Sequence, residues 1–265
     1  MIAAGIVDAH NVTDAWVKYV DLVTPHRPKE LFHPAVRAAN PVGESDAGRR
    51  ALEDFLAEWS QQDSRVYPVS TVRTTIFPKH YAQRSGSAGE LADSYRADYP
   101  KIRKSNPANM SGTYFGRIVD AQVSRDGSHY DQLNDTIKKL RGRNGNATMT
   151  EIDLRFEIDV DAPALGVYET ERNHARRMGF PCMSHLSFQR DGGMLHVAAF
   201  YRNQDIGRKA YGNMLGLGQL CEYIAQQTEL SCGHLTLLAG RAYLDAPAAL
   251  LRKHLPLIKA ASEAP

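Results

Sequence analysis

Two adjacent strand patterns joined by a tight turn constrain the fold of this chain more than any other feature. The stretches 183–189 and 194–201 both favour strands, and Arg190-Asp191-Gly192-Gly193 between them is a compact hairpin signal. The two strands should therefore pair antiparallel. A packed helix should follow over residues 213–227, where apolar side chains recur at helical spacing: Met214, Leu217, Leu220, Cys221 and Ile224.

Further elements are expected on both sides of this hairpin and helix. Apolar residues at helical spacing predict a helix over residues 46–59, and residues 131–140 favour a helix that ends in a loop over 141–146. Alternating apolar and charged residues predict a half-buried strand over residues 152–158. Residues 234–238 favour another strand, and a short amphipathic helix should lie beyond Asp245.

The length of 265 residues suits one large domain or two small ones, and no repeat or low-complexity segment forces a division. A single domain over residues 1–265 is therefore expected. Its 43% hydrophobic and 23% charged residues are typical of a protein with a sizeable core. Polar and charged residues dominate residues 86–109, which predicts a variable and mobile surface region with a short helix near Glu90–Tyr95.

The formal net charge of +2 argues against polymeric nucleic acid and an anionic membrane as partners, because both need a concentrated basic face. Cys182, Cys221 and Cys232 lack the pair spacing of a zinc site, and their odd number disfavours a disulfide framework. The histidines form no HExxH motif, so no metal site is expected. The N-terminal residues resemble neither a signal peptide nor a membrane span, and we expect a cytoplasmic location.

The most informative stretch of the sequence runs from Gly179 to Asp245. Its segments Gly179-Phe180-Pro181-Cys182 and Tyr201-Arg202-Asn203-Gln204-Asp205 resemble the active-site turn and the Gln-Arg-Ser-x-Asp motif of thymidylate synthase and its pyrimidine hydroxymethylase relatives. Arg202 follows Cys182 by twenty residues, as in the family, and Asn213 lies eleven residues beyond Arg202, as the family's base-reading asparagine does. This ordered set of spacings is more specific than any single motif.

Similarity outside this run is thinner, although Tyr114-Phe115-Gly116-Arg117 resembles the family's Tyr-Gly turn and residues 126–133 resemble its Asp-Gly-x-x-x-Asp-Gln segment. The resemblance implies an α+β fold with a thymidylate synthase-like mixed sheet and packed helices. It also implies a homodimer whose sheets pack together. The implied substrate is a pyrimidine nucleoside or nucleotide, and the implied carbon donor is 5,10-methylenetetrahydrofolate.

The resemblance implies that Cys182 is the catalytic nucleophile. A thiolate that adds to C6 of a pyrimidine activates C5 and can leave again afterwards. Arg202, at the end of the paired strand, should face Cys182, lower the pKa of its thiol and hold a phosphate. Asp205 should orient the base and the pterin, which completes the expected catalytic set.

Five further residues are assigned to substrate binding by resemblance. The side-chain amide of Asn213 can read the N3–O4 edge of uracil, and because cytosine hydroxymethylases commonly carry aspartate there, uracil is slightly favoured. Asn203 should support the anionic end of the ligand. Tyr114 lies in the Tyr-Gly turn, and Tyr243 and Asp245 align with the histidine and tyrosine that hold deoxyribose in the family.

Most of these residues also have a purely structural interpretation. Cys182 fits a small buried hydrophobic residue, and Arg202 and Asp205 fit a solvated ion pair. Asn213 fits a helix N-cap, a role compatible with base reading, and Tyr243 fits a core aromatic.

Several positions depart from the family pattern. The paired phosphate-binding arginines align with Ala147-Thr148, and the N-terminal phosphate-loop arginine is replaced around Asn40-Pro41-Val42-Gly43. Neither tryptophan lies in the folate-stacking segment, and only twenty residues follow Asp245, so the family's longer C-terminal region is not expected in full. Glu53 and Glu90 are the candidates for the family's catalytic glutamate.

The leading hypothesis is a divergent thymidylate synthase-like enzyme in which Cys182 activates a pyrimidine nucleoside or nucleotide for methylation or hydroxymethylation at C5. Two alternatives remain open. One is folate-independent chemistry that keeps the cysteine adduct and acts on a modified pyrimidine or related heterocycle. The other is a non-catalytic nucleotide-binding protein with the same fold.

Overall fold

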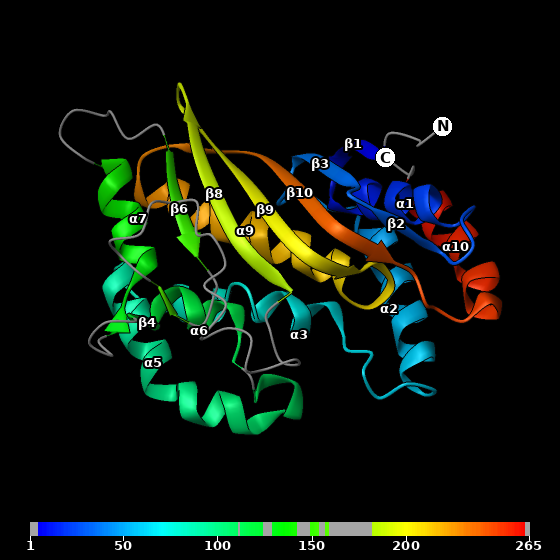
Figure 1. Cartoon of the computed structure of the whole chain (residues 1–265), viewed down its shortest axis with the longest axis horizontal. Coiled ribbons are helices and arrows are strands. Elements are labelled where there is room, and N and C mark those ends of the chain that lie inside the picture. The colour runs from blue at the N-terminus through cyan, green and yellow to red at the C-terminus, as the bar shows by residue number, and fades with distance from the viewer. Residues whose placement is uncertain are drawn as a thin grey trace.

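A mixed sheet forms the frame of the molecule. The computed structural model describes residues 5–110, 112–123, 129–141, 149–153, 157–158 and 182–262. The strands of this sheet are β1 (Ile6–Asn11), β2 (Glu30–Phe32), β3 (Ala35–Asn40), β6 (Met149–Asp153), β8 (Met183–Asp191), β9 (Met194–Asp205) and β10 (Ser231–Tyr243). Within the described residues the sheet has seven strands in the order β1-β3-β10-β9-β8-β6, with β2 paired to β10 (Figure 1).

Helices pack around this sheet. The longer ones are α1 (Val12–Val23), α2 (Asp46–Ser60), α5 (Ala88–Ser105), α7 (Gln132–Arg141), α9 (Tyr211–Gln227) and α10 (Ala248–Ser262). The shorter helical segments are α3 (Val69–Thr74), α4 (Lys79–Ala82), η1 (Pro107–Asn109), α6 (Tyr114–Val119) and the π-helical turn η2 (Ile206–Ala210). Figure 1 shows α1, α2 and α10 gathered at the β1 end of the sheet, and α5, α6 and α7 at the β6 end. The predicted α+β fold with a mixed sheet and packed helices is therefore confirmed.

The predicted hairpin is confirmed and extends beyond its expected limits. β8 and β9 pair antiparallel from Met183 opposite Tyr201 to Asp191 opposite Met194. β10 then lies parallel to β9, which places Tyr243 opposite Asp205. The carboxyl ends of β9 and β10 therefore meet beside the start of β8.

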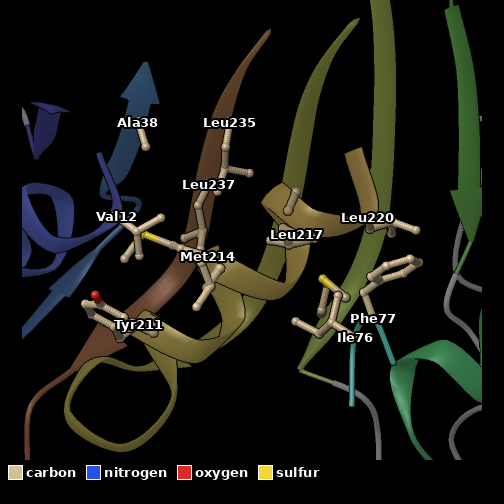
Figure 2. Close-up of a cluster of buried hydrophobic side chains, with 14 of the residues drawn as sticks. Val12, Ala38, Ile76, Phe77, Tyr211, Met214, Leu217, Leu220, Leu235 and Leu237 are labelled. Carbon is tan, nitrogen blue, oxygen red and sulfur yellow. The ribbon is translucent and has the colours of Figure 1, made fainter. Parts of the chain in front are cut away.

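The core lies between α9 and one face of the sheet. The predicted stripe of α9 is buried, and Figure 2 shows Met214 and Leu217 beside Leu235 and Leu237 of β10. Val12, at the start of α1, closes the same cluster. Because α9 fills this layer, its first turn is fixed next to the carboxyl ends of β9 and β10.

Close packing of α9 depends on Gly218. A Cβ built there would lie 2.0 Å from the backbone oxygen of Pro41, which a side-chain rotation cannot relieve. Gly218→Ala should therefore lower the free energy of unfolding by about 3 kcal/mol, because overpacking forces backbone shifts. Urea denaturation measures the change.

Gly193→Ala is the matched control for that substitution, because a Cβ at this hairpin glycine would meet nothing within 4 Å. A Gly218→Ala variant as stable as Gly193→Ala would show that the contact with Pro41 is not tight.

The structure corrects the expectation for residues 86–109. Instead of one short helix, α5 spans Ala88–Ser105 with Pro100 inside it. Ser87 caps α5 by accepting a hydrogen bond from the Glu90 backbone N–H, and one side of the helix is buried through Ala88, Leu91, Ala92 and Tyr95. The expected mobility of the region stays a prediction.

The strand expected over residues 152–158 is also corrected. Its first part belongs to β6, which pairs with β8. Its last part is β7 (Glu157–Ile158), which pairs with β4 (Ala121–Val123) in a small sheet that also contains β5 (His129–Tyr130). Residues 154–156 and 142–148, which include most of the predicted loop, lie outside the described residues.

No helix in the described part of the chain is both long and apolar enough to cross a membrane. The single domain over residues 1–265 stays a prediction.

Candidate functional site

A cavity of about 390 Å³ lies where β8 begins and where β9 and β10 end. Most of the residues assigned by resemblance contribute to its wall: Tyr114, Cys182, Asn203, Asp205, Asn213 and Tyr243. In the described chain, Arg202 and Asp245 lie outside that wall. The fold thus brings together side chains that are up to 129 positions apart, from Tyr114 to Tyr243.

Cys182 sits directly before β8 and is half-buried. Its backbone oxygen accepts a hydrogen bond of 2.7 Å from the Arg202 backbone N–H, so the hairpin fixes the position of the cysteine. The backbone N–H of Met183 donates to the Tyr114 hydroxyl at 3.3 Å, which holds the tyrosine ring beside the cysteine. The residues of the predicted turn before Cys182, Gly179-Phe180-Pro181, lie outside the described residues.

The electrostatic surroundings of Cys182 differ from the expectation. Burial raises the pKa of the thiol above its ordinary value, while Arg202 and Lys209 oppose this shift and Asp205 adds to it. Arg202 acts in the predicted direction, but its side chain is exposed, and burial outweighs it. The thiol therefore has a raised pKa where a lowered one was expected, and a phosphate-binding role for Arg202 stays a prediction.

Asp205 is held by Arg208. One carboxylate oxygen accepts from the Arg208 backbone N–H at 3.0 Å and caps η2, and the other accepts from the guanidinium at 2.8 Å. The Tyr243 hydroxyl donates to the same carboxylate at 3.4 Å. Asp205 is thus fixed in the cavity wall, and Tyr243 is a wall residue and not a plain core aromatic.

Arg208 is a buried cation at the centre of a charge cluster. Its guanidinium also pairs with Asp63 at 2.7 Å and with Asp245 at 2.5 Å, and it lies 4.5 Å from the ring centroid of Trp59. The side chain is only 6% exposed. Asp245 therefore contacts Arg208, the same arginine that holds Asp205. The contact of Asp245 with a sugar stays a prediction.

Two asparagines add amide groups to the wall. Asn203 accepts a hydrogen bond of 3.4 Å from the Arg241 guanidinium. Asn213 is buried within the first turn of α9, which begins at Tyr211. The N-cap position belongs to Ala210, so the alternative that Asn213 caps this helix is wrong.

Two cationic wall residues were not found from the sequence. Lys209 follows Arg208, and its ammonium lies 4.9 Å from the ring centroid of Tyr67. Arg117, on α6, is half-buried, and burial lowers the pKa of both side chains. Lys209 lies in the sequence between two motif residues, Asp205 and Asn213. That position is the sequence feature that could have identified it as a site residue.

Neither candidate glutamate reaches the described wall of the cavity. Glu53 pairs with Arg49 at 2.8 Å, and Glu90 accepts from the Gly86 backbone N–H at 2.7 Å. Among the described wall residues, Asp205 is the one carboxylate. No cluster of three or more potential metal ligands occurs within the described residues.

A second cavity of about 370 Å³ adjoins the first and shares Thr71, Thr75, Asn109 and Thr113 with it. It lies among α3, α4 and α5. Both tryptophans, Trp16 and Trp59, are buried in the core. The described walls of the two cavities are therefore built without tryptophan.

A cavity at the end of a mixed sheet, lined by a cysteine, an aspartate and an asparagine, agrees with the resemblance to thymidylate synthase. A protein of Methanopyrus kandleri named "Putative thymidylate synthase" is 38% identical to the chain over 198 residues, which are 74% of this chain and 87% of that protein. A protein of the same name from Methanothermobacter thermautotrophicus is 24% identical over 157 residues, 58% of this chain and 64% of that protein. No family model matches the chain. The similarity to the first relative shows that the chain belongs to the thymidylate synthase family.

Proposed function

We propose that the chain is a thymidylate synthase-like enzyme in which the Cys182 thiolate adds to C6 of a pyrimidine nucleoside or nucleotide and activates C5 for one-carbon transfer. The observation that carries this proposal is the cavity wall. It combines Cys182 with Asp205 and with the amides of Asn203 and Asn213, from three separate segments of the chain. The names of the two relatives support a thymidylate synthase-like function.

The proposed chemistry begins with loss of the thiol proton to solvent. The sulfur of Cys182 then forms a bond to C6, and the electrons of the C5–C6 double bond move toward the oxygen at C4. C5 thereby becomes nucleophilic and takes up a proton or a one-carbon electrophile. Loss of the original proton from C5 and departure of the thiolate restore the aromatic ring.

The wall also offers groups that would hold the base. The buried amide of Asn213 has both a donor and an acceptor, which match the N3–O4 edge of uracil. The side chains of Tyr114 and Tyr243 also line the cavity, where aromatic rings can pack against a base. Asp205, held by Arg208, would accept a hydrogen bond from the substrate or the carbon donor.

Methylenetetrahydrofolate, the carbon donor implied by the family, is not matched by the described wall of the second cavity. The wall of the second cavity has no lysine or arginine among its described residues that would pair with the carboxylates of a folate. Trp16 and Trp59 are buried in the core, so neither can stack on a pterin. We therefore derive no step through folate, and both methylation and hydroxymethylation at C5 belong to the proposal.

A substrate panel tests the proposal. Uridine, deoxyuridine, cytidine, deoxycytidine and their monophosphates are incubated with the protein, with and without methylenetetrahydrofolate, and the products are analysed by mass spectrometry. A mass increase of a methyl or hydroxymethyl group on one pyrimidine is expected. Ligand binding without any mass change across the panel would favour the non-catalytic alternative.

We also propose that the chain is a homodimer. Leu238 of β10 is 40% exposed although the adjacent Leu237 is fully buried, and Phe200 of β9 is only half-buried. A second copy that packs on this side of the sheet would cover both side chains. Light scattering at micromolar concentration should give twice the chain mass, and a monomer mass would contradict the proposal.

A further inference from the structure

Lys209 differs from the arginine that precedes it. Arg208 pairs with Asp63, Asp205 and Asp245, so its charge is compensated. Lys209 forms no hydrogen bond or ion pair among the described residues, and its ammonium contacts the ring of Tyr67. The Tyr67 hydroxyl donates to the Asn106 side chain at 3.3 Å, which holds that ring in place. An ammonium without a bonded carboxylate is thus kept in the cavity wall.

This ammonium and Cys182 line the same cavity, and its positive charge favours the thiolate. Burial raises the pKa of the thiol, and the two groups that oppose burial are Arg202 and Lys209. The guanidinium of Arg202 is exposed, so water and salt screen its charge, whereas Lys209 is half-buried in the same wall as Cys182. A charge in a shielded position acts more strongly on its neighbours than one in water.

We propose that Lys209 is the cationic partner of the Cys182 sulfur and stabilises the thiolate when it forms before the attack and when it leaves the substrate. In the attack, the S–C6 bond forms and the ring electrons move to the oxygen at C4. Lys209 remains protonated throughout, and the thiol proton goes to solvent. The use of the thiolate for addition to a pyrimidine rests on the proposed function, but the effect of Lys209 on the sulfur does not.

The test is the rate at which iodoacetamide alkylates Cys182 as a function of pH, followed by peptide mass spectrometry so that Cys221 and Cys232 are scored separately. Lys209→Met should shift the pH profile of Cys182 upward by about one unit and slow alkylation at neutral pH about tenfold. Lys209→Arg should stay close to the wild type because it keeps the charge. Other groups facing the thiol are Arg202, Asp205, Tyr114, Tyr201 and Tyr243, and they are unchanged in these variants.

Two further variants sharpen the comparison. Lys138→Met removes an exposed lysine on α7 and should leave the profile unchanged. Arg202→Met should also shift the profile upward, and its effect should fade in about 0.5 M salt, where exposed charges are screened. Lys209→Gln replaces Lys209→Met if the methionine variant does not fold.

A Lys209→Met profile that coincides with the wild type would overturn the proposal, and so would a Lys209→Arg profile that coincides with Lys209→Met. The assay needs no substrate. If Lys209→Met shifts the profile but no pyrimidine is ever turned over, the proposed function fails and the partnership of Lys209 with Cys182 stands. If turnover depends on Cys182 but the profile does not shift in Lys209→Met, the proposed function stands and the partnership of Lys209 with Cys182 fails.

Discussion

Replacing Cys182 with serine should abolish turnover, with a loss of at least about 10³-fold, while the fold and most of the ligand affinity remain. Serine is nearly isosteric with cysteine, but its hydroxyl ionises far less and adds much less readily to a pyrimidine ring. The backbone hydrogen bond between Cys182 and Arg202 does not involve the side chain, so the hairpin should be unaffected. Product formation, calorimetric ligand binding and thermal unfolding measure the three quantities.

Cys221→Ser is the matched control for this substitution. Cys221 is fully buried on α9, and its thiol donates to the Leu195 backbone oxygen at 3.3 Å. Burying a hydroxyl costs more free energy than burying a thiol, so we expect the free energy of unfolding to fall by about 1–3 kcal/mol. The folded protein should keep its activity. An active Cys182→Ser variant would exclude the covalent mechanism.

Arg208→Met should lower the free energy of unfolding by about 3–5 kcal/mol, because it leaves three carboxylates without their shared cation. The side chain is 6% exposed and lies over the Trp59 ring, and Asp63 and Asp205 are only 15% and 12% exposed, so water reaches these two carboxylates poorly. The methionine keeps most of the apolar contact. Chemical denaturation, with ligand binding measured on the folded fraction, separates stability from the position of Asp205.

Arg65→Met tests whether burial is the reason for this effect. Arg65 pairs with the same carboxylate, Asp63, but its side chain is 75% exposed, and its removal should hardly change stability. Similar losses of stability in Arg65→Met and Arg208→Met would show that burial of Arg208 does not cause the large effect of its replacement.

Lowering the pH should reduce the difference in free energy of unfolding between the wild type and Arg208→Met. Hydrogen bonds from Arg65 and Arg208 lower the pKa of Asp63. The stabilisation from a carboxylate with a lowered pKa is present above its unfolded pKa of about 4 and is lost as the pH falls below it. Protonation also removes the uncompensated charge in the variant, so the two stabilities should converge. A difference in free energy of unfolding that grows as the pH falls would contradict this account.

Parts of the fold that depend on local sequence could be predicted. The β8–β9 hairpin follows from its turn residues, and α2 and α9 follow from apolar side chains at helical spacing. The long helix α5 could not be predicted, because two of its four buried residues are alanines within a polar stretch and give little periodic signal. The parallel pairing of β1 with β3 depends on contacts remote in sequence.

The site shows the same division. Resemblance identified Cys182, Asp205 and Asn213, and the fold places all three in one wall. The different environments of Arg208 and Lys209 could not be predicted, because adjacent basic residues look alike in a sequence. Their difference arises from carboxylates brought in by distant segments and from the turn of η2.

The most direct test of the central claim is exchange of the hydrogen at pyrimidine C5 with solvent deuterium, measured by proton NMR without any carbon donor. Addition of Cys182 to C6 makes C5 protonatable, so the wild type should replace this hydrogen in at least one uracil or cytosine nucleoside or nucleotide, and Cys182→Ser should not. Exchange that proceeds equally in Cys182→Ser, or no exchange for any pyrimidine that binds, would contradict the proposed cysteine adduct.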